Sequence, residues 1–262
     1  MSDVLMHERN GVLWLQLNRP ERRNAYDLEM ATTLHDHLLG ASAYESVVIT
    51  GSGGSFCAGG ALTQLDDPDP DQLRALFTAS WRLVDAIRAC PRPVIAAVNG
   101  AAAGGGNELV VACDLAVAAR SATFGQTGPK VGSAPVLGAT NVMAVQIGEK
   151  RAKELSFLCE RYSADVALEM GLVNKVVDDD ELDGAVTAMT DRIHLMSPRY
   201  LEIAKVSSNV WWNASRDSMA TGIAMLVQAI GSDDMREGAR AFLEKRPPEF
   251  RRGRAEPQGA AE

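Results

Sequence analysis

Two glycine-rich segments stand out because each follows a short apolar stretch. Residues Gly51–Gly60 follow Val47–Thr50, and residues Asn99–Glu108 follow Pro93–Val98. In the second segment three adjacent glycines, 104–106, precede a helical pattern, and such a run costs backbone entropy unless the backbone must be exposed. A helix N-terminus offers free N–H groups and a partial positive charge, which stabilise a developing oxyanion. We therefore predict that two backbone N–H groups, one from each segment, converge on one carbonyl oxygen.

Nucleotide-binding loops are a competing interpretation of these glycines, and specific positions exclude them. A phosphate-binding P-loop closes with Gly-Lys-Ser/Thr, which the first segment lacks. A dinucleotide fingerprint needs a third glycine where this chain has Phe56. A simpler alternative stays open, in which the glycines of the first segment serve only a tight turn.

Apolar patterns predict the elements that hold these segments. Alternation predicts a strand over Val12–Leu17, and continuous apolar runs predict buried strands at Val47–Thr50, Pro93–Val98 and Leu115–Ala119. Such strands alternating with helices are typical of β–α units around a mainly parallel sheet. Helical spacing predicts these segments: Asp27–Leu39 with Asp27 as cap, Gln72–Cys90, Asn107–Cys113, Glu149–Leu158, Ala164–Met170, Glu181–Leu195, Arg199–Trp212, Ser218–Ile230 and Asp233–Lys245, with only Leu172–Val177 extended in the last third.

Composition excludes several classes of function. The 262 residues carry a formal net charge of −8, and a bulk nucleic-acid partner needs a basic face instead. The four cysteines form no CxxC pair and the four histidines lie outside every motif, so we expect neither disulfides nor a metal site. The polar N-terminus lacks a signal-peptide core and the apolar stretches are too short to span a bilayer, which predicts a cytoplasmic protein with no membrane partner.

Six short motifs follow one another along the chain. They are Asn-Arg-Pro-x-x-x-Asn-Ala at 18–25, Ser-Phe-Cys-Ala-Gly-Gly at 55–60, Val-Asn-Gly-x-x-x-Gly-Gly-Gly-x-Glu at 98–108 and Cys-Asp-x-x-x-Ala at 113–118, followed by Met-Gly-Leu-Val-Asn-Lys-Val-Val at 170–177 and Glu-Gly-x-x-Ala-Phe-x-Glu-Lys-Arg at 237–246. In order and spacing they resemble the crotonase (enoyl-CoA hydratase/isomerase) superfamily, from about Val12 to Phe250.

The resemblance implies an α/β fold, the ClpP-like spiral of ββα units with a C-terminal helical trimerisation region. It divides the chain into a core of residues 1–195 and a helical region of residues 196–262, which completes the CoA site of a neighbouring subunit in a trimer or hexamer. It implies that Gly60 and Gly105 carry the oxyanion-hole N–H groups, with Gly104 beside them. Arg23 and the segment Ala58–Leu62, which includes Ala61 and Leu62, would lie along the CoA. Phe242 and Lys245 would reach the CoA of a neighbour.

The resemblance also locates the catalytic acids. Hydratases of the family hold two glutamates over the substrate, and the first falls on Glu108. The second falls twenty residues later, where this chain has Gly128. An alternative for Glu108 is a first-turn glutamate that only complements the helix dipole.

The segment 124–133 is most similar to 1,4-dihydroxy-2-naphthoyl-CoA synthases and to ring-opening 2-ketocyclohexanecarboxyl-CoA hydrolases. In those synthases a glycine at the Gly128 position leaves room for a bicarbonate base, with Gln126 and Thr127 beside it. Ser133, at the end of the segment, is a further candidate for substrate binding. The chain departs from them after Ser133, where Ala134 and Pro135 cannot replace the family's aspartate.

Three hypotheses follow for an acyl-CoA substrate. The first is a hydratase or isomerase of enoyl-CoA with Glu108 as acid–base residue. The second is a synthase-like or ring-opening carbon–carbon bond enzyme on a cyclic acyl-CoA, and the third is an inactive CoA-binding homologue. No separate cofactor is expected, because CoA is part of the substrate; bicarbonate at Gly128 is the exception under the second hypothesis.

Overall fold

A computed structural model of the chain describes residues 2–61 and 69–250. Within these residues ten strands form two sheets. The larger sheet has the order β1-β2-β3-β5-β7-β10, from Val4–Arg9, Val12–Leu17, Ser46–Gly51, Val94–Val98, Leu115–Ala119 and Lys175–Val177. The smaller has the order β4-β6-β8-β9, from Ser55–Cys57, Ala101–Ala103, Thr123–Gly125 and Tyr162–Ser163. Only the β1–β2 and β8–β9 pairs among them are antiparallel.

From β3 to β8, consecutive strands alternate between the two sheets. The chain passes from β3 to β4, returns through a helix to β5, continues to β6, and returns through a second helix to β7 and β8. Each turn therefore contributes one strand to each sheet and most turns add one helix, which is the predicted repeat of ββα units. The spiral brings the ends of β3 and β5 together, because these strands pair in parallel from Val47–Val94 to Thr50–Ala97.

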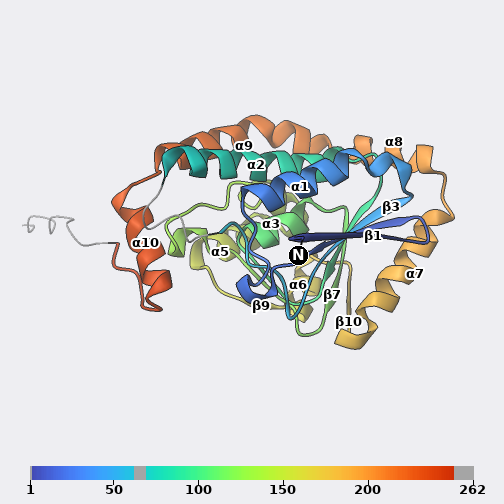
Figure 1. Cartoon of the computed structure of the whole chain (residues 1–262), viewed down its shortest axis with the longest axis horizontal. Coiled ribbons are helices and arrows are strands. Elements are labelled where there is room, and N and C mark those ends of the chain that lie inside the picture. The colour runs from blue at the N-terminus through green and yellow to red at the C-terminus, as the bar shows by residue number, and fades with distance from the viewer. Residues whose placement is uncertain (1, 62–68, 251–262) are drawn as a thin grey trace, which may run out of the picture.

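Helices cover both faces of the larger sheet (Figure 1). One side carries α1, α2 and α9, with α2 and α9 in contact along their lengths, and α7 packs on β3, β5 and β7 from the other side. This double cover explains why all five residues of β5 are buried and apolar. The helices are α1 Leu28–Leu39, α2 Pro70–Ala89, α3 Gly105–Ala112, α4 Val142–Ile147, α5 Glu149–Leu158, α6 Ala164–Met170, α7 Leu182–His194, α8 Pro198–Ser208, α9 Val210–Gln228 and α10 Asp233–Leu243; short 3-10 turns lie at Pro20–Arg22, Ala41–Ala43, Gly128–Lys130 and Asp179–Glu181.

Several predicted elements are confirmed. The strand β2 has the predicted bounds, and α1 begins after Asp27, whose carboxylate accepts a hydrogen bond of 3.0 Å from the Met30 N–H. The helices α5 and α6 also begin and end where helical spacing places them.

The break between the last long helices was predicted wrongly. We expected one helix to end at Trp212 and the next to begin at Ser218, whereas α8 and α9 are separated only by Asn209. Asn209 is buried, and its side chain is tied to Arg88 at the end of α2, where its amide donates to the backbone carbonyl at 2.9 Å. A tertiary contact therefore determines the break, which no local pattern marks.

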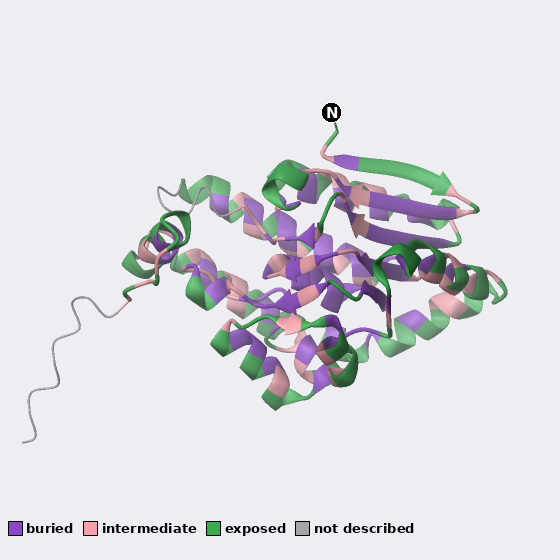
Figure 2. Cartoon of the chain, turned by 90° about the horizontal axis from the view of Figure 1, so that it is seen from below, coloured by how far each residue is buried: buried purple, intermediate pink, exposed green. Residues whose placement is uncertain are grey.

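Five strands escaped the prediction. In β1 four of the six residues face solvent, so its sequence shows no alternation; its exposed outer surface is visible at the edge of the sheet in Figure 2. The strands β4, β6 and β8 have three residues each and β9 has two, and β4 and β6 lie inside the glycine-rich segments. Runs this short give no periodic signal.

Most of residues 196–250 lies in the helices α8, α9 and α10. The helix α9 packs on α2 and α4, and Gly238 of α10 lies against the backbone of Val131 and Gly132. Among the described residues no helix is long and apolar enough to cross a membrane.

Candidate active site

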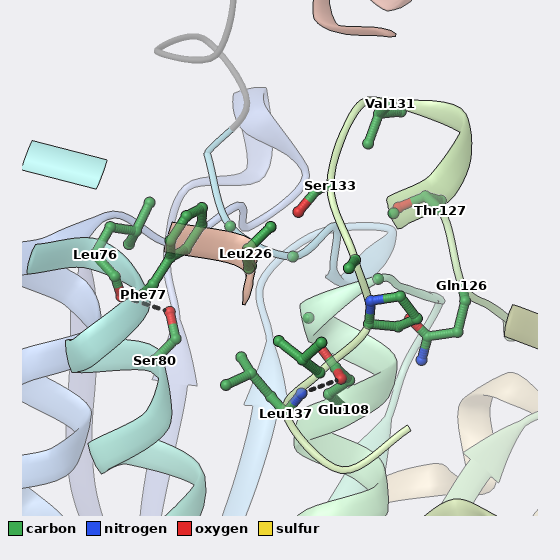
Figure 3. Close-up of a pocket in the computed structure, with 18 of the residues that line it drawn as sticks. Leu76, Phe77, Ser80, Glu108, Gln126, Thr127, Val131, Ser133, Leu137 and Leu226 are labelled. Atoms are coloured by element: carbon green, nitrogen blue, oxygen red, sulfur yellow. Dashed lines mark hydrogen bonds between the residues drawn. The ribbon is translucent and has the colours of Figure 1, made fainter. Parts of the chain in front are cut away.

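Two neighbouring cavities lie at the end of the spiral where the glycine-rich segments meet. The first has a volume of about 80 Å³ and the second about 550 Å³. They share a wall formed by Ala58, Gln126, Thr127 and Val131. Figure 3 shows the first cavity between α2, α3 and the loop that follows β8. Its described lining is Tyr26, Ala58, Gly59, Gly60, Ala61, Leu76, Phe77, Ser80, Gly104, Gly105, Glu108, Gln126, Thr127, Gly128, Val131, Ser133, Ala134, Pro135, Val136, Leu137, Ile223 and Leu226.

Two motif asparagines hold the first glycine-rich segment in place. The side-chain amide of Asn24, which is fully buried, donates to the carbonyls of Ser52 and Ser55 at 2.9 and 2.8 Å. The side chain of Asn99 accepts from the Gly51 N–H at 3.0 Å and donates to the Gly53 carbonyl at 2.8 Å. These bonds satisfy the backbone of the loop and fix it against the start of the second segment.

Gly60 and Gly105 both line the first cavity, and their N–H groups have no backbone partner. The backbone N–H of Tyr26 donates to the Gly59 carbonyl at 3.0 Å, and the backbone carbonyl of Tyr26 accepts from the Ala61 N–H at 2.8 Å. The N–H of the intervening Gly60 therefore faces away from the Tyr26 backbone. Gly105 is the first residue of α3, where N–H groups have no intrahelical acceptor. Within residues 2–61 and 69–250 neither N–H makes a hydrogen bond, whereas the Gly104 N–H donates to the Gly125 carbonyl at 2.9 Å.

The two segments touch at this point. A Cβ built on Gly59, whose φ is +95°, would lie 2.9 Å from the Gly105 nitrogen. Only glycine allows both this backbone conformation and this approach. A tight turn alone therefore does not account for the glycines of the first segment, because Gly59 is also needed for contact with the N-terminus of α3.

Glu108 lies in the first turn of α3 with 3% of its surface exposed, and it lines the first cavity. Its Oε1 accepts hydrogen bonds from the backbone N–H groups of Leu137, at 2.7 Å, and Ala139, at 3.4 Å; Figure 3 shows the first of these bonds. Burial raises the pKa of Glu108 from 4.5 to about 8, although both hydrogen bonds oppose that shift. A pKa near neutrality suits a residue that must both accept and return a proton.

Among the described residues of the first cavity, Glu108 carries the only carboxyl group. At the second-glutamate position Gly128 begins a 3-10 turn, and its carbonyl accepts from the Ser133 N–H at 2.8 Å. A Cβ built on Gly128 would lie 3.1 Å from the backbone N, Cα and C atoms of Ala134. A side chain at this position would therefore press on the loop backbone, while Gly128 itself lines the first cavity.

Gln126 is fully buried in the shared wall, and neither amide atom has a hydrogen-bond partner within the described residues. Thr127 lies beside Gly104, because a Cβ on that glycine would approach the Thr127 hydroxyl to 2.8 Å. Ser133 lines the first cavity. The residues Gln126, Thr127, Gly128 and Ser133 are therefore brought together, as the sequence predicted.

The second cavity is lined mainly by cationic side chains among its charged residues. Its described lining includes Arg23, Lys130, Arg161, Lys245 and Arg246, against the single acid Glu160. Arg246 is paired with Glu237 at 2.6 Å, whereas no ion pair within the described residues involves the other four cations. Such a lining suits a polyanionic ligand.

Phe242 and Lys245 line this second cavity together with Arg23 of the same chain. Lys245 takes a left-handed backbone conformation, with φ +56°, directly after α10. One chain thus assembles these three residues without a neighbour, and the role of Phe242 and Lys245 across a subunit interface stays a prediction. Of the segment expected along the CoA, Ala58 and Ala61 line the first cavity, and Leu62 lies outside the described residues.

Sequence patterns missed two polar residues of the first cavity, Tyr26 and Ser80. Tyr26 directly follows the motif pair Asn24-Ala25, so its backbone position was predictable while its side chain was not. Ser80 lies one turn after Leu76 on α2, and its hydroxyl donates to the Leu76 carbonyl at 2.8 Å. Helical spacing places Leu76 and Ser80 on one face, although it does not show what that face contacts.

Elsewhere in the part of the chain that the structure describes, no group of three or more His, Cys, Asp or Glu side chains could hold a metal ion. All four cysteines are free thiols, and burial raises the pKa of the Cys57 thiol to about 12. A nucleophilic thiolate at Cys57 is therefore disfavoured.

Comparison with known proteins agrees with this geometry. An enoyl-CoA hydratase from Mycobacterium avium subsp. paratuberculosis is 28% identical, with a TM-score of 0.84 over 95% of this chain and 98% of that chain. An enoyl-CoA hydratase from Bacillus anthracis is 30% identical, with a TM-score of 0.77 over 95% and 99%. One from Bacillus halodurans, at 23% identity and a TM-score of 0.85 over 92% and 100%, shares the fold. The family model described as enoyl-CoA hydratase/isomerase matches residues 7–253, and the chain belongs to this family, the crotonase superfamily.

Proposed function

We propose that the chain catalyses proton transfer at the α-carbon of an enoyl-CoA thioester, with Glu108 as the single acid–base side chain and the N–H groups of Gly60 and Gly105 as donors to the enolate oxygen. The observation that carries this proposal is the position of Glu108, buried in the same small cavity as two unpaired N–H groups. An acid–base residue and an oxyanion site are the two parts that enolate chemistry needs.

The second cavity supports a CoA ester as substrate. Coenzyme A carries several phosphate charges, and Arg23, Lys130 and Lys245 line a space of about 550 Å³ that adjoins the acyl cavity through a shared wall. A thioester at that wall would have its acyl group in the smaller cavity and its CoA portion among the cations.

Double-bond isomerisation is the reaction that this site supports best. Glu108 would take a proton from C2 of a 3-enoyl-CoA, and the electron pair would delocalise onto the thioester oxygen. Return of a proton from the Glu108 carboxyl group to C4 moves the double bond to C2–C3 and regenerates the carboxylate. One carboxyl group suffices for this shuttle, and the described lining of the cavity contains one.

Hydration is the second candidate, because the same carboxyl group could deprotonate a water that adds at C3 while C2 gains a proton. It is favoured less, since family hydratases place that water with two glutamates and Gly128 supplies no carboxyl group at the second position. An inactive CoA-binding role would require Glu108 to point away from the cavity, and Glu108 lines it.

Carbon–carbon bond chemistry with a bicarbonate base is the remaining alternative. The unpartnered Gln126 amide is compatible with such an anion and Gly128 lines the same cavity, but no cationic side chain is among the described lining residues to balance the anion's charge. We therefore assign no step to bicarbonate. If bicarbonate nevertheless raises activity toward o-succinylbenzoyl-CoA or a 2-ketocycloalkyl-CoA, the alternative replaces our proposal.

The experiment compares wild type with Glu108→Gln on a 3-enoyl-CoA and on crotonyl-CoA, with exchange of C2 hydrogens in D₂O as a separate readout. We expect isomerisation and exchange by the wild type and a loss of about 10²–10⁴-fold in the variant. Glu169→Gln, an exposed glutamate paired with Arg151, is the matched control and should match wild type. Absence of both turnover and exchange in a folded wild type would refute the proposal.

A further inference from the structure

The position of Tyr26 suggests a role that the two glycines do not fill. Its ring lies against both of them: a Cβ built on Gly60 would be 3.9 Å from Tyr26 Cε2, and one built on Gly105 would overlap the Tyr26 hydroxyl. Tyr26 is 2% exposed, yet it lines the first cavity. The phenolic oxygen therefore lies at the N-terminus of α3, within a few ångströms of a proposed enolate donor.

We propose that the Tyr26 hydroxyl is a third donor to the thioester oxygen, beside the N–H groups of Gly60 and Gly105, so that the oxyanion site has one side-chain donor as well as two backbone donors. The inference rests on the proposed function, because it concerns the same enolate. It makes Tyr26 a catalytic residue in the strict sense, one that touches a reacting atom.

The backbone holds Tyr26 rigidly in this position. Its N–H and carbonyl are bonded to Gly59 and Ala61, the residues that flank Gly60, at 3.0 and 2.8 Å. Tyr26 and the first N–H donor thus belong to one hydrogen-bonded ladder and keep a constant separation. A donor fixed before the substrate arrives costs no reorganisation when charge develops on the oxygen.

The chemistry of the phenol suits a donor rather than a base. Burial raises the pKa of Tyr26 well above its ordinary value, with the nearby Cys57 and Glu108 adding to the shift, so the hydroxyl keeps its proton. The Ser80 side chain lies beside the phenol and opposes this shift in its pKa. The Ser80 hydroxyl already donates to the Leu76 carbonyl, so Ser80 can only accept from Tyr26 while that bond lasts. A negatively charged thioester oxygen is a stronger acceptor than this neutral hydroxyl, and the Tyr26 proton would turn to it.

The test uses Tyr26→Phe, which keeps the ring and removes the hydroxyl. We expect kcat/KM to fall about 10- to 100-fold with KM nearly unchanged, the range for a hydrogen bond to a charged group. Ser80→Ala removes only the competing acceptor and should not reduce kcat/KM comparably. Tyr162→Phe is the matched control, because the Tyr162 hydroxyl bonds Glu154 at 3.0 Å outside the lining of either cavity.

A spectroscopic readout separates a donor from a packing residue. Butyryl-CoA labelled with ¹³C at the thioester carbonyl is bound to each protein, and the carbonyl stretch is measured by infrared difference spectroscopy. Each hydrogen bond to the oxygen lowers the stretching frequency, so Tyr26→Phe should raise it relative to wild type while Tyr162→Phe leaves it unchanged.

An identical carbonyl band in wild type and Tyr26→Phe would overturn the inference and leave the proposed function standing, provided that the wild-type band still shifts on binding. A wild-type band that stays at its position in water would instead refute the oxyanion site itself and the inference with it. Unfolding temperatures of the variants, measured alongside, identify any loss that comes from the fold.

Discussion

The Oε1 atom of Glu108 accepts a hydrogen bond of 2.7 Å from the backbone N–H of Leu137, 29 residues further along the chain. This bond occupies one carboxyl oxygen and leaves Oε2 without a partner among the described residues, on a side chain that lines the acyl cavity. The loop after β8 therefore orients the residue on which the proposed chemistry depends.

The pH dependence of catalysis should report the state of Glu108. Only its ionised form can take a proton, and burial raises its pKa to about 8. We expect kcat/KM to rise about tenfold per pH unit below pH 8 and to level off above it. Initial rates from pH 6 to 9.5 measure this profile, and a plateau that already begins near pH 5 would contradict it.

Stability should respond to the same group with the opposite trend. The folded protein holds the Glu108 proton up to about pH 8, whereas the unfolded chain releases it near 4.5. The free energy of unfolding should therefore fall as pH rises between these values, with a slope approaching about 1.4 kcal/mol per pH unit from this group. Glu108→Gln keeps an acceptor for the Leu137 N–H and lacks this slope. Urea titrations at pH 5 and pH 8 should show that the free energy of unfolding of the variant, relative to that of wild type, is higher at pH 8 than at pH 5.

Gly105 and Tyr26 should be energetically coupled. A methyl group at Gly105 would overlap the Tyr26 hydroxyl, so Gly105→Ala should lower kcat/KM by about 100-fold or more. Without that hydroxyl the nearest ring carbon would be 3.1 Å away, and a shift of a few tenths of an ångström relieves the contact. In the Tyr26→Phe background Gly105→Ala should therefore lower kcat/KM by about tenfold or less. A double-mutant cycle measures the difference, and strictly additive losses would show that the two residues do not touch.

Lys245 should act on the cavity of its own chain. Because Lys245 and Arg23 line one cavity within a single chain, Lys245→Gln should raise KM about threefold to tenfold for acyl-CoA with little change in kcat. The decisive measurement mixes Glu108→Gln and Lys245→Gln subunits after dissociation and reassembly. If each site is completed within one chain, the mixture should show the average of the activities of the two variants. Recovery of wild-type KM in the mixture would show instead that Lys245 serves a neighbour, as the family resemblance implies.

Assembly into a trimer or hexamer stays a prediction with one structural support. Large apolar side chains between the end of α7 and the start of α9 are exposed: Leu195, Tyr200, Val206, Val210 and Trp211 are each 57–80% accessible. Exposed apolar area on this scale is typical of an interface. Sedimentation velocity at micromolar concentration should give the mass of three or six chains, and charged replacements at Val206 and Trp211 should yield a monomer.

The sequence by itself determined the family, the two glycine-rich segments and Glu108, because these depend on motifs whose residues lie close together along the chain. It also determined β2 and α1, where alternation and the Asp27 cap are local signals. Such features depend on patterns over a few residues; the structure confirms the bounds of β2 and the start of α1, and the family model confirms the family.

Only the tertiary structure decided how distant residues share the site. Tyr26 follows a motif, but its contact with Gly105 spans 79 residues and depends on how the spiral closes. The sequence showed that Gly128 lacks the second carboxylate, and only the structure shows that a side chain there would meet the Ala134 backbone at 3.1 Å. Phe242 and Lys245 meet Arg23 within one chain because α10 packs against Val131 and Gly132, a contact that no local pattern encodes. Packing decides these positions, since each depends on the volume and path of segments far away in the sequence.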